Sequence, residues 1–197
     1  MRIPRAFAAA APLVEEQDAA VLAELEPVAG PGWQLLPCNL TKQEKTEWCW
    51  VAVAQAVDRA HKVEETQCNL ARALIPTTCG TECSTDECNS PQPLANLLKV
   101  RQRLVEPILG RIKFDAIKAQ IEDKALVCAR LDRPPNGHFV VICGYSESGG
   151  QKIAIIDPSP DVASGPQSHD YTQFLIRYDT EDGGKWDQTY LTKRPPP

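Results

Sequence analysis

The stretch that decides the fold is Gln43-Glu-Lys-Thr-Glu-Trp-Cys-Trp50, which continues directly into VAVAQAVDRAH, residues 51–61. It places Cys49 at the start of an apolar segment, with Gln43 six residues upstream. A cysteine attacks as the thiolate, and the backbone N–H groups at a helix N-terminus favour negative charge. We therefore interpret Cys49 as a catalytic nucleophile. The alternative is a small core residue, which is the commoner role of a cysteine in an apolar helix.

The pattern after the cysteine predicts a helix over residues 48–61. Apolar side chains recur at helical spacing, and the face shared with Cys49 carries residues that let another element pack closely: Ala52, Val53, Ala56 and Ala60. Thr46 or Glu47 is expected to cap the helix N-terminus. Gln43 would donate a side-chain N–H to an oxyanion, together with the backbone N–H of Cys49.

A cysteine nucleophile needs a base, and the sequence has three histidines. His138 follows Gly137 and begins a predicted strand, so it would lie at the end of a sheet from which it can reach Cys49. Asp157 ends the next predicted strand, before Pro158, and a hairpin would bring its carboxylate close to His138. That carboxylate can accept the Nδ1–H of the imidazole, fix its tautomer and stabilise the imidazolium. Taken singly, either residue would also suit an ordinary turn.

The other two histidines are weaker candidates for the base. His61 lies at the far end of the predicted helix, about 18 Å from Cys49 at 1.5 Å per residue. Its expected role is that of a cation at the helix C-terminus. His169 stands in the polar segment Ser168-His-Asp170, which predicts a surface loop, and no strand positions it.

Three motifs in this order resemble the papain-like cysteine proteases. They are the glutamine and the tryptophan-flanked cysteine of residues 43–50, the run GHFVVICGY of 137–145 and the run IAIIDP of 153–158. The similarity spans roughly residues 40–192 and is greatest to the compact bacterial branch, which includes AvrRpt2-type effector proteases and the staphopains. It implies an α+β fold, with an N-terminal helical lobe, a C-terminal antiparallel β lobe and an active site in the cleft between them.

The resemblance also implies roles for individual residues. Cys49, His138 and Asp157 would form a catalytic triad, and Gln43 would complete an oxyanion hole. Neither a metal ion nor an organic cofactor is expected. The tryptophans expected to line the cleft, or else to pack in the core, are Trp48, Trp50 and Trp186.

The residue pattern divides the chain into four parts. Residues 1–35 read as a leader or pro-like segment, or else as a disordered tail, with a short helix over 18–27. Residues 36–105 form the expected helical lobe, 106–193 the β-sheet lobe with its histidine and aspartate, and 194–197 a tail. The expected helices are 48–61, 67–74, 93–100 and a stripe at Phe114, Ile117 and Ile121. The expected strands are 125–132, 138–145, 152–157 and 185–192, while 171–178 suits either state.

The number and spacing of the cysteines do not determine which of them form disulfides. With Cys49 as nucleophile, seven of the eight cysteines remain, so at least one more thiol stays unpaired. Four of them lie close together in sequence: Cys68, Cys79, Cys83 and Cys88. They could form one or two disulfides, remain as thiols or bind zinc, although the spacing lacks the paired C-x2-C of zinc ribbons. The resemblance favours disulfides or plain thiols.

Composition narrows the range of partners. The net charge of −5 with mixed signs along the chain argues against a nucleic-acid binder, and no apolar run approaches the ~20 residues of a membrane span. The N-terminus mimics a signal peptide weakly, with an apolar run broken by Pro12. Delivery to a target cell without a cleavable signal is the expected localisation, with the cytoplasm as the alternative.

The expected function is a cysteine endopeptidase acting on a protein substrate, as a delivered bacterial effector or toxin with a cognate inhibitor or immunity protein. The same triad also supports deamidation, transglutamination or acyl transfer on a protein, since only the leaving group and the acceptor change. A third alternative is an inactive binding module that kept the papain fold. The substrate and the preferred cleavage sequence lie outside these motifs.

Overall fold

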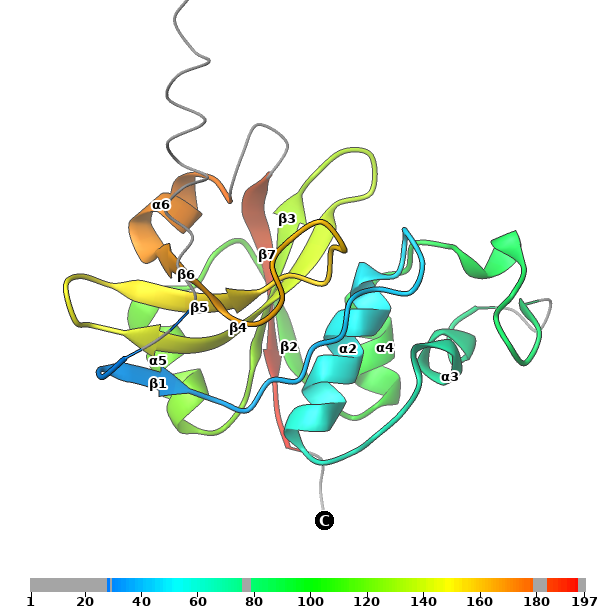
Figure 1. Ribbon diagram of the computed structural model, residues 1–197, viewed down its shortest axis with the longest axis horizontal. Helices are drawn as coiled ribbons and strands as arrows, with labels where there is room; N and C mark the ends of the chain where they lie inside the picture. Colours follow the sequence, from blue (N-terminus) through cyan, green and yellow to red (C-terminus); the bar gives the residue numbers. More distant parts are fainter. Residues whose placement is uncertain (1–27, 29, 76–78, 179–183, 195–197) are drawn as a thin grey trace, which may run out of the picture.

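The computed structural model describes residue 28 and residues 30–75, 79–178 and 184–194. The helix expected over residues 18–27 lies outside the described residues. The described part is a mixed structure of helices and one antiparallel sheet (Figure 1).

The sheet has seven strands among the described residues. They are β1 (Trp33–Leu35), β2 (Leu104–Leu109), β3 (Val127–Asp132), β4 (His138–Ser146), β5 (Lys152–Ile156), β6 (Gln167–Asp170) and β7 (Lys185–Thr192). Their order is β2-β7-β3-β4-β5-β6, every pairing is antiparallel, and β1 pairs with the end of β4. The long central strand β4 is buried along its whole length and therefore anchors the core.

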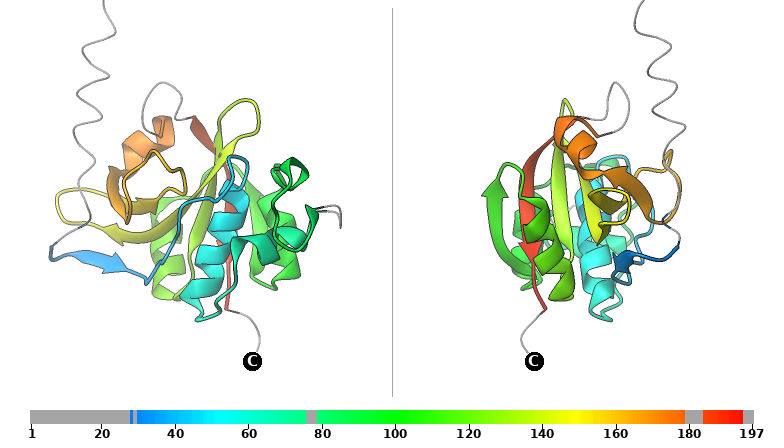
Figure 2. Two further views of the ribbon diagram at one scale, coloured as in Figure 1. Left: turned by 45° about the vertical axis from the view of Figure 1, so that its right-hand side comes forward. Right: turned by 90° about the vertical axis from the view of Figure 1, so that its left-hand side faces the viewer.

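The helices pack around this sheet. They are α2 (Cys49–Ala60), α3 (Gln67–Arg72), α4 (Leu94–Val100), α5 (Phe114–Glu122) and α6 (Tyr171–Ile176), with the short 3-10 helix η2 (Asp86–Cys88). Helix α2 packs against β4, and α3 and α4 pack against α2 on the right of Figure 1. Helix α5 packs against β3 and β4, while α6 packs against β6 and β7 (Figure 2).

Helix α2 confirms the helix predicted from the sequence, and its burial explains why it contains so many small residues. All its residues from Cys49 to Asp58 are buried, so the small alanines allow other elements to approach from several directions. The predicted cap is wrong. Trp48 is the N-cap residue, and no side chain caps the helix. Thr46 and Glu47 instead contact distant residues, because tertiary hydrogen bonds occupy their side chains.

A buried ion triad fixes the other end of α2. Asp58 accepts from Arg101 Nε at 2.7 Å and from Arg103 Nε at 2.6 Å. Asp58 and Arg103 are almost completely buried, whereas Arg101 is partly exposed. The ion triad therefore ties helix α2 to the connection between α4 and β2.

The strands β3, β4, β5 and β7 lie where the sequence predicted them. Strands β2 and β6 were not predicted, because β2 contains Pro107 and β6 is the polar tetrapeptide Gln167–Asp170. The ambiguous segment 171–178 contains α6, with Asp170 as its capping side chain.

Gly144 allows β1 to join the sheet. A Cβ atom at this position would lie 2.4 Å from Leu35 Cδ2 and 2.6 Å from the carbonyl oxygen of Gln34. Only glycine permits this close approach of the two backbones. Among the described residues, no helix combines the length and hydropathy needed to cross a bilayer.

Candidate active site

Cys49 is the first residue of α2, as the sequence predicted. Its backbone N–H belongs to the first turn and has no intrahelical acceptor. The residue is 8 % exposed, and its side chain interacts with the imidazole of His138 closely enough to help raise the pKa of that ring. The nucleophile candidate thus lies at a helix N-terminus, in contact with the candidate base.

His138 is the first residue of β4, and the glycine before it sets its position. Gly137 has φ +75°, and a Cβ atom there would lie 2.6–2.8 Å from the guanidinium atoms of Arg130. The left-handed backbone therefore favours glycine, whereas the flexible end of the Arg130 side chain could move aside for a Cβ atom. The backbone N–H of Gly137 donates to the Arg133 carbonyl at 2.6 Å, which closes the turn into the strand.

Asp157 follows directly after β5 and lies beside His138. Its Oδ1 is 2.7 Å from His138 Nε2 and accepts from the backbone N–H of Ser159, also at 2.7 Å. Its Oδ2 accepts from the hydroxyl of Tyr178 at 3.0 Å. The prediction that Nδ1 of the imidazole faces the carboxylate is wrong. The ring presents Nε2 to Asp157, and the sequence did not predict this because a position at the start of a strand does not determine which ring nitrogen faces the carboxylate.

The two buried partners shift each other's pKa in opposite directions. Burial disfavours the imidazolium, but the hydrogen bonds to Asp157 and Cys49 outweigh burial and raise the pKa of His138 to about 9. Burial likewise disfavours the carboxylate, yet His138, the Ser159 N–H and the Tyr178 hydroxyl together lower the pKa of Asp157 to about 2. At neutral pH the pair is therefore an imidazolium and a carboxylate.

Gln43 lies in the loop before the nucleophile, and its amide is engaged there. Its Nε2 donates to the carbonyl oxygens of Lys45 at 3.0 Å and Thr46 at 2.6 Å. Its Oε1 is buried without a partner among the described residues. To serve an oxyanion, the Gln43 amide has to exchange one of these two carbonyl acceptors for the new charge.

The loop that carries Gln43 is fastened to the loop that carries Asp157. The backbone N–H of Gln43 donates to the Pro158 carbonyl at 2.9 Å. Lys42 Nζ donates to the carbonyls of Asp157 at 3.2 Å and Val162 at 2.7 Å. The segments before Cys49 and after β5 therefore hold a common position.

A pocket of about 270 Å³ opens beside Cys49. It combines apolar walls with a polar rim, and its lining residues are Glu47, Cys49, Trp50, Pro91, Gln92, Pro93, Arg130, Asn136, Gly137, Phe139, Gln188 and Tyr190. Trp50 is among them. Trp48 and Trp186 are not, because both are buried elsewhere: Trp48 Nε1 donates to the Cys88 carbonyl at 2.7 Å, and Trp186 packs on Phe174.

Two polar contacts involve residues that line this pocket. Asn136 Nδ2 donates to Glu47 Oε2 at 2.9 Å, joining the residue two before His138 to the residue two before Cys49. Arg130 forms an ion pair with Asp187. The contact between Asn136 and Glu47 thus joins the segments that lead into His138 and Cys49.

The position of His169 and the charge of His61 differ from what the sequence predicted. His169 lies on strand β6, not on a surface loop, and burial lowers its pKa to about 4. Its ring packs 5.2 Å from that of Tyr178, between centroids, and also contacts Phe174. His61 follows α2, but burial and nearby Arg103 lower its pKa, so it is not the expected cation at neutral pH.

Sequence reasoning missed Ser159 and Tyr178, the other partners of Asp157. Ser159 lies two residues after Asp157, and its N–H–carboxylate bond is a common Asx-type turn that the Asp-Pro-Ser sequence could have suggested. Tyr178 is 21 residues away and gave no such signal.

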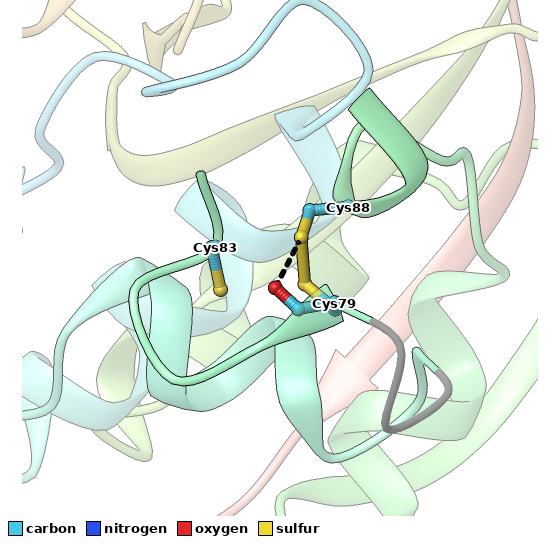
Figure 3. A group of neighbouring side chains, drawn as sticks. All are labelled: Cys79, Cys83 and Cys88. Atoms are coloured by element: carbon cyan, nitrogen blue, oxygen red, sulfur yellow. Dashed lines mark hydrogen bonds between the residues drawn. A yellow bond between two sulfur atoms is a disulfide. The ribbon is translucent and has the colours of Figure 1, made fainter. Parts of the chain in front are cut away.

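The cysteine-rich loop contains two disulfides, Cys68–Cys83 and Cys79–Cys88. Three of these sulfur atoms, from Cys79, Cys83 and Cys88, lie within 4.8 Å of one another (Figure 3). Because the sulfurs are bonded in pairs, this form lacks the thiolates that zinc would need. Among the described residues, the unpaired cysteines are Cys38, Cys49, Cys128 and Cys143.

The mixed arrangement of helices and one antiparallel sheet is a papain-like peptidase fold, and the comparison with known families defines the class as cysteine peptidases. The chain matches the model of the Peptidase_C39 like family over residues 35–185 and belongs to that family, which indicates a cysteine peptidase. A similar solved structure is the peptidase domain of Streptococcus ComA, a bi-functional ABC transporter involved in a quorum-sensing pathway. It shares 14 % identity with a TM-score of 0.50, over 81 % of this chain and 100 % of that one, which shows likeness of fold. Nothing matched among curated proteins. The resemblance to effector proteases and staphopains stays a prediction.

Proposed function

We propose that the protein is a cysteine endopeptidase that hydrolyses peptide bonds in protein substrates through Cys49, His138 and Asp157. The observation that carries the proposal is the buried imidazole of His138, whose Nε2 lies 2.7 Å from the carboxylate of Asp157 and whose pKa is raised by both Asp157 and Cys49. A nucleophile, a base and a group that orients the base are the minimum for nucleophilic acyl transfer.

The proposed reaction begins with the Cys49 thiolate beside the His138 imidazolium. A pKa of about 9 keeps His138 protonated at neutral pH, so the imidazolium stabilises the thiolate and holds the proton that the leaving amine needs. Attack on the peptide carbonyl forms a C–S bond and an oxyanion. Transfer of the His138 proton to the amine accompanies cleavage of the C–N bond and leaves an acyl-enzyme.

Hydrolysis of the acyl-enzyme reverses these roles. Neutral His138 takes a proton from water, the hydroxide displaces the thiolate, and Asp157 stabilises the imidazolium that re-forms. The backbone N–H of Cys49 and the Gln43 amide would stabilise the oxyanion in both steps. The pocket beside Cys49 would hold a substrate side chain next to the scissile bond, and we propose that the cleft between helices and sheet holds the extended substrate.

The two disulfides indicate the kind of compartment in which the peptidase would act. Disulfides persist in oxidising compartments, so two of them favour a peptidase that acts outside the reducing cytosol. We retain, as a proposal, a delivered effector or toxin that cleaves proteins of another cell, and the disulfides would then place its targets outside a reducing cytosol. A cognate inhibitor would have to cover Cys49 and the adjoining pocket.

The test is covalent labelling with an epoxysuccinyl cysteine-protease inhibitor, followed by intact-mass measurement and peptide mapping. One adduct on Cys49 is expected, and it should be absent in Cys49→Ala and His138→Ala. Labelling of Cys38 or other thiols at a similar rate would contradict an activated Cys49.

A second measurement separates hydrolysis of peptide bonds from the other reactions of this triad. Incubation with fluorescently labelled casein should give shorter chains in a Cys49-dependent manner. A mass gain of about one dalton without chain cleavage would instead indicate deamidation.

A further inference from the structure

We propose that Asn89 is a positioning residue of the peptidase site, holding the segment that carries the nucleophile; this rests on the proposed function. Asn89 directly follows η2, and its backbone N–H donates to the Asp86 carbonyl at 2.9 Å. The preceding residue, Cys88, is completely buried and bonded to Cys79 (Figure 3). The Asn89 side chain therefore projects from backbone that a disulfide and a helical turn hold in place.

Both ends of the Asn89 carboxamide bind the residues that lead into Cys49. Oδ1 accepts from the backbone N–H of Glu47 at 2.9 Å, and Nδ2 donates to Thr46 Oγ1 at 2.7 Å. Helix α2 has no side-chain cap of its own. Glu47 precedes the N-cap residue Trp48, so Asn89, 42 residues away in sequence, holds the segment that leads into the helix and does not cap the helix itself.

The neighbours of Asn89 hold the tryptophans on either side of the nucleophile. The carbonyl of Cys88 accepts from Trp48 Nε1 at 2.7 Å, and that of Ser90 accepts from Trp50 Nε1 at 3.2 Å. Those bonds use backbone carbonyls and therefore survive truncation of the Asn89 side chain. Loss of the carboxamide should release Thr46 and Glu47 while leaving the tryptophans and the pocket wall in place.

The bond to Thr46 continues toward the oxyanion donor. The carbonyl of Thr46 accepts from Gln43 Nε2 at 2.6 Å, so Asn89, Thr46 and Gln43 form one connected chain. Displacement of a catalytic group by about 1 Å can cost about 100-fold in rate. Asn89 acts on catalysis through the donors that surround the oxyanion, without touching the substrate.

The test compares two reactions of Cys49 that differ in their need for an oxyanion hole. Hydrolysis of p-nitrophenyl acetate passes through an oxyanion, whereas alkylation by iodoacetamide does not. Asn89→Ala should lower Cys49-dependent ester hydrolysis about 10- to 100-fold, because misplaced oxyanion donors cost rates of this order. Alkylation of Cys49 should stay within about 3-fold, because it requires only the thiolate.

Two further variants separate positioning from general damage. In Asn89→Asp, one carboxylate oxygen can accept from Glu47 N–H and the other from the Thr46 hydroxyl, so most of the hydrolysis should return. Adding Thr46→Val to Asn89→Ala should cause little further loss, since the contact is already gone. The matched control is Asn96→Ala, an exposed asparagine on α4, which should behave as the wild type.

The outcomes distinguish the two proposals. Wild-type hydrolysis in Asn89→Ala, equal losses of hydrolysis and alkylation, or no recovery in Asn89→Asp would each overturn the role of Asn89. A wild-type chain no more active than Cys49→Ala would overturn the peptidase proposal, and the role of Asn89 with it.

Discussion

Nε2 of His138 lies 2.7 Å from Oδ1 of Asp157, and both side chains are more than nine-tenths buried. Water cannot easily screen or replace this contact, so each residue determines the charge of the other. The carboxylate is also held from two other directions, by Ser159 and Tyr178. This geometry makes the acid–base behaviour of the site testable by substitution.

Asp157→Asn should move the alkaline limit of activity to lower pH. The proposed reaction requires protonated His138, whose pKa of about 9 depends on the hydrogen bond and charge of Asp157. Asparagine can still accept from Nε2 but brings no charge, so burial then dominates and the pKa of His138 falls. We expect the alkaline limb of the ester-hydrolysis profile to shift down by more than about one pH unit, and the rate at pH 8 to fall about 10-fold or more.

The control for this profile is Asp161→Asn, which neutralises an exposed aspartate on the same loop. Its alkaline limb should coincide with that of the wild type. If Asp157→Asn also kept the wild-type limb near pH 9, Asp157 would not be the group that sustains the imidazolium.

Tyr178→Phe should weaken both the site and the fold. It removes the donor to Asp157 Oδ2 and leaves that buried oxygen without this bond. An unsatisfied buried acceptor costs about 1–3 kcal/mol, so urea denaturation should show a loss of that size. Activity should also fall, because the pKa of Asp157 rises and the carboxylate loses one of its fixed contacts.

Tyr145→Phe is the matched comparison for Tyr178→Phe. The Tyr145 hydroxyl also donates to a carboxylate, that of Glu122, but on the α5 side of the sheet. Stability can change there, whereas hydrolysis should not. An equal loss of activity in the two variants would assign Tyr178 to general packing rather than to the support of Asp157.

The positions of Cys49, His138 and Asp157 were predictable because each stands at a boundary that local sequence marks. Cys49 begins an apolar helical run, His138 follows a turn glycine, and Asp157 precedes a proline at a strand end. The structure brings these three residues together, as the order of helix and hairpin predicted. Their catalytic roles stay proposals.

The contacts that support these residues were not predictable, since they join segments far apart in sequence. Asn89 reaches Glu47 over 42 residues, and Tyr178 reaches Asp157 over 21. Local preference was misleading at the helix start for the same reason, because Thr46 and Glu47 look like caps but bind other segments. The orientation of the imidazole also depends on tertiary placement, which strand alternation alone does not determine.

His169 should make the fold sensitive to mild acid. Burial lowers its pKa in the folded protein to about 4, against an ordinary value near 6.5. Between these values the unfolded chain binds a proton that the folded chain does not, so stability falls as the pH falls from 6.5 to 4. The full contribution is about 3 kcal/mol or less, at 1.36 kcal/mol per pH unit.

The measurement is urea denaturation at several pH values between 4 and 7, in a Cys49→Ala background that prevents self-cleavage. His169→Phe should flatten the pH dependence, whatever its effect at pH 7. His61→Gln is the comparison, because that residue is less buried and should remove less of the slope. A curve for His169→Phe parallel to the parent would show that this histidine does not carry the sensitivity.

Asp58→Asn should destabilise the protein more than any surface substitution of the same kind. The change leaves Arg103 buried and Arg101 partly buried without their common carboxylate. Removing one partner of a buried ion pair costs about 3–5 kcal/mol, because the remaining charge stays desolvated. The exposed pair of Arg59 and Glu64 provides the control: Glu64→Gln should cost less than about 1 kcal/mol. The measurement is thermal unfolding of both variants, and similar midpoints would mean that Asp58 does not fasten helix α2 to the connection before β2.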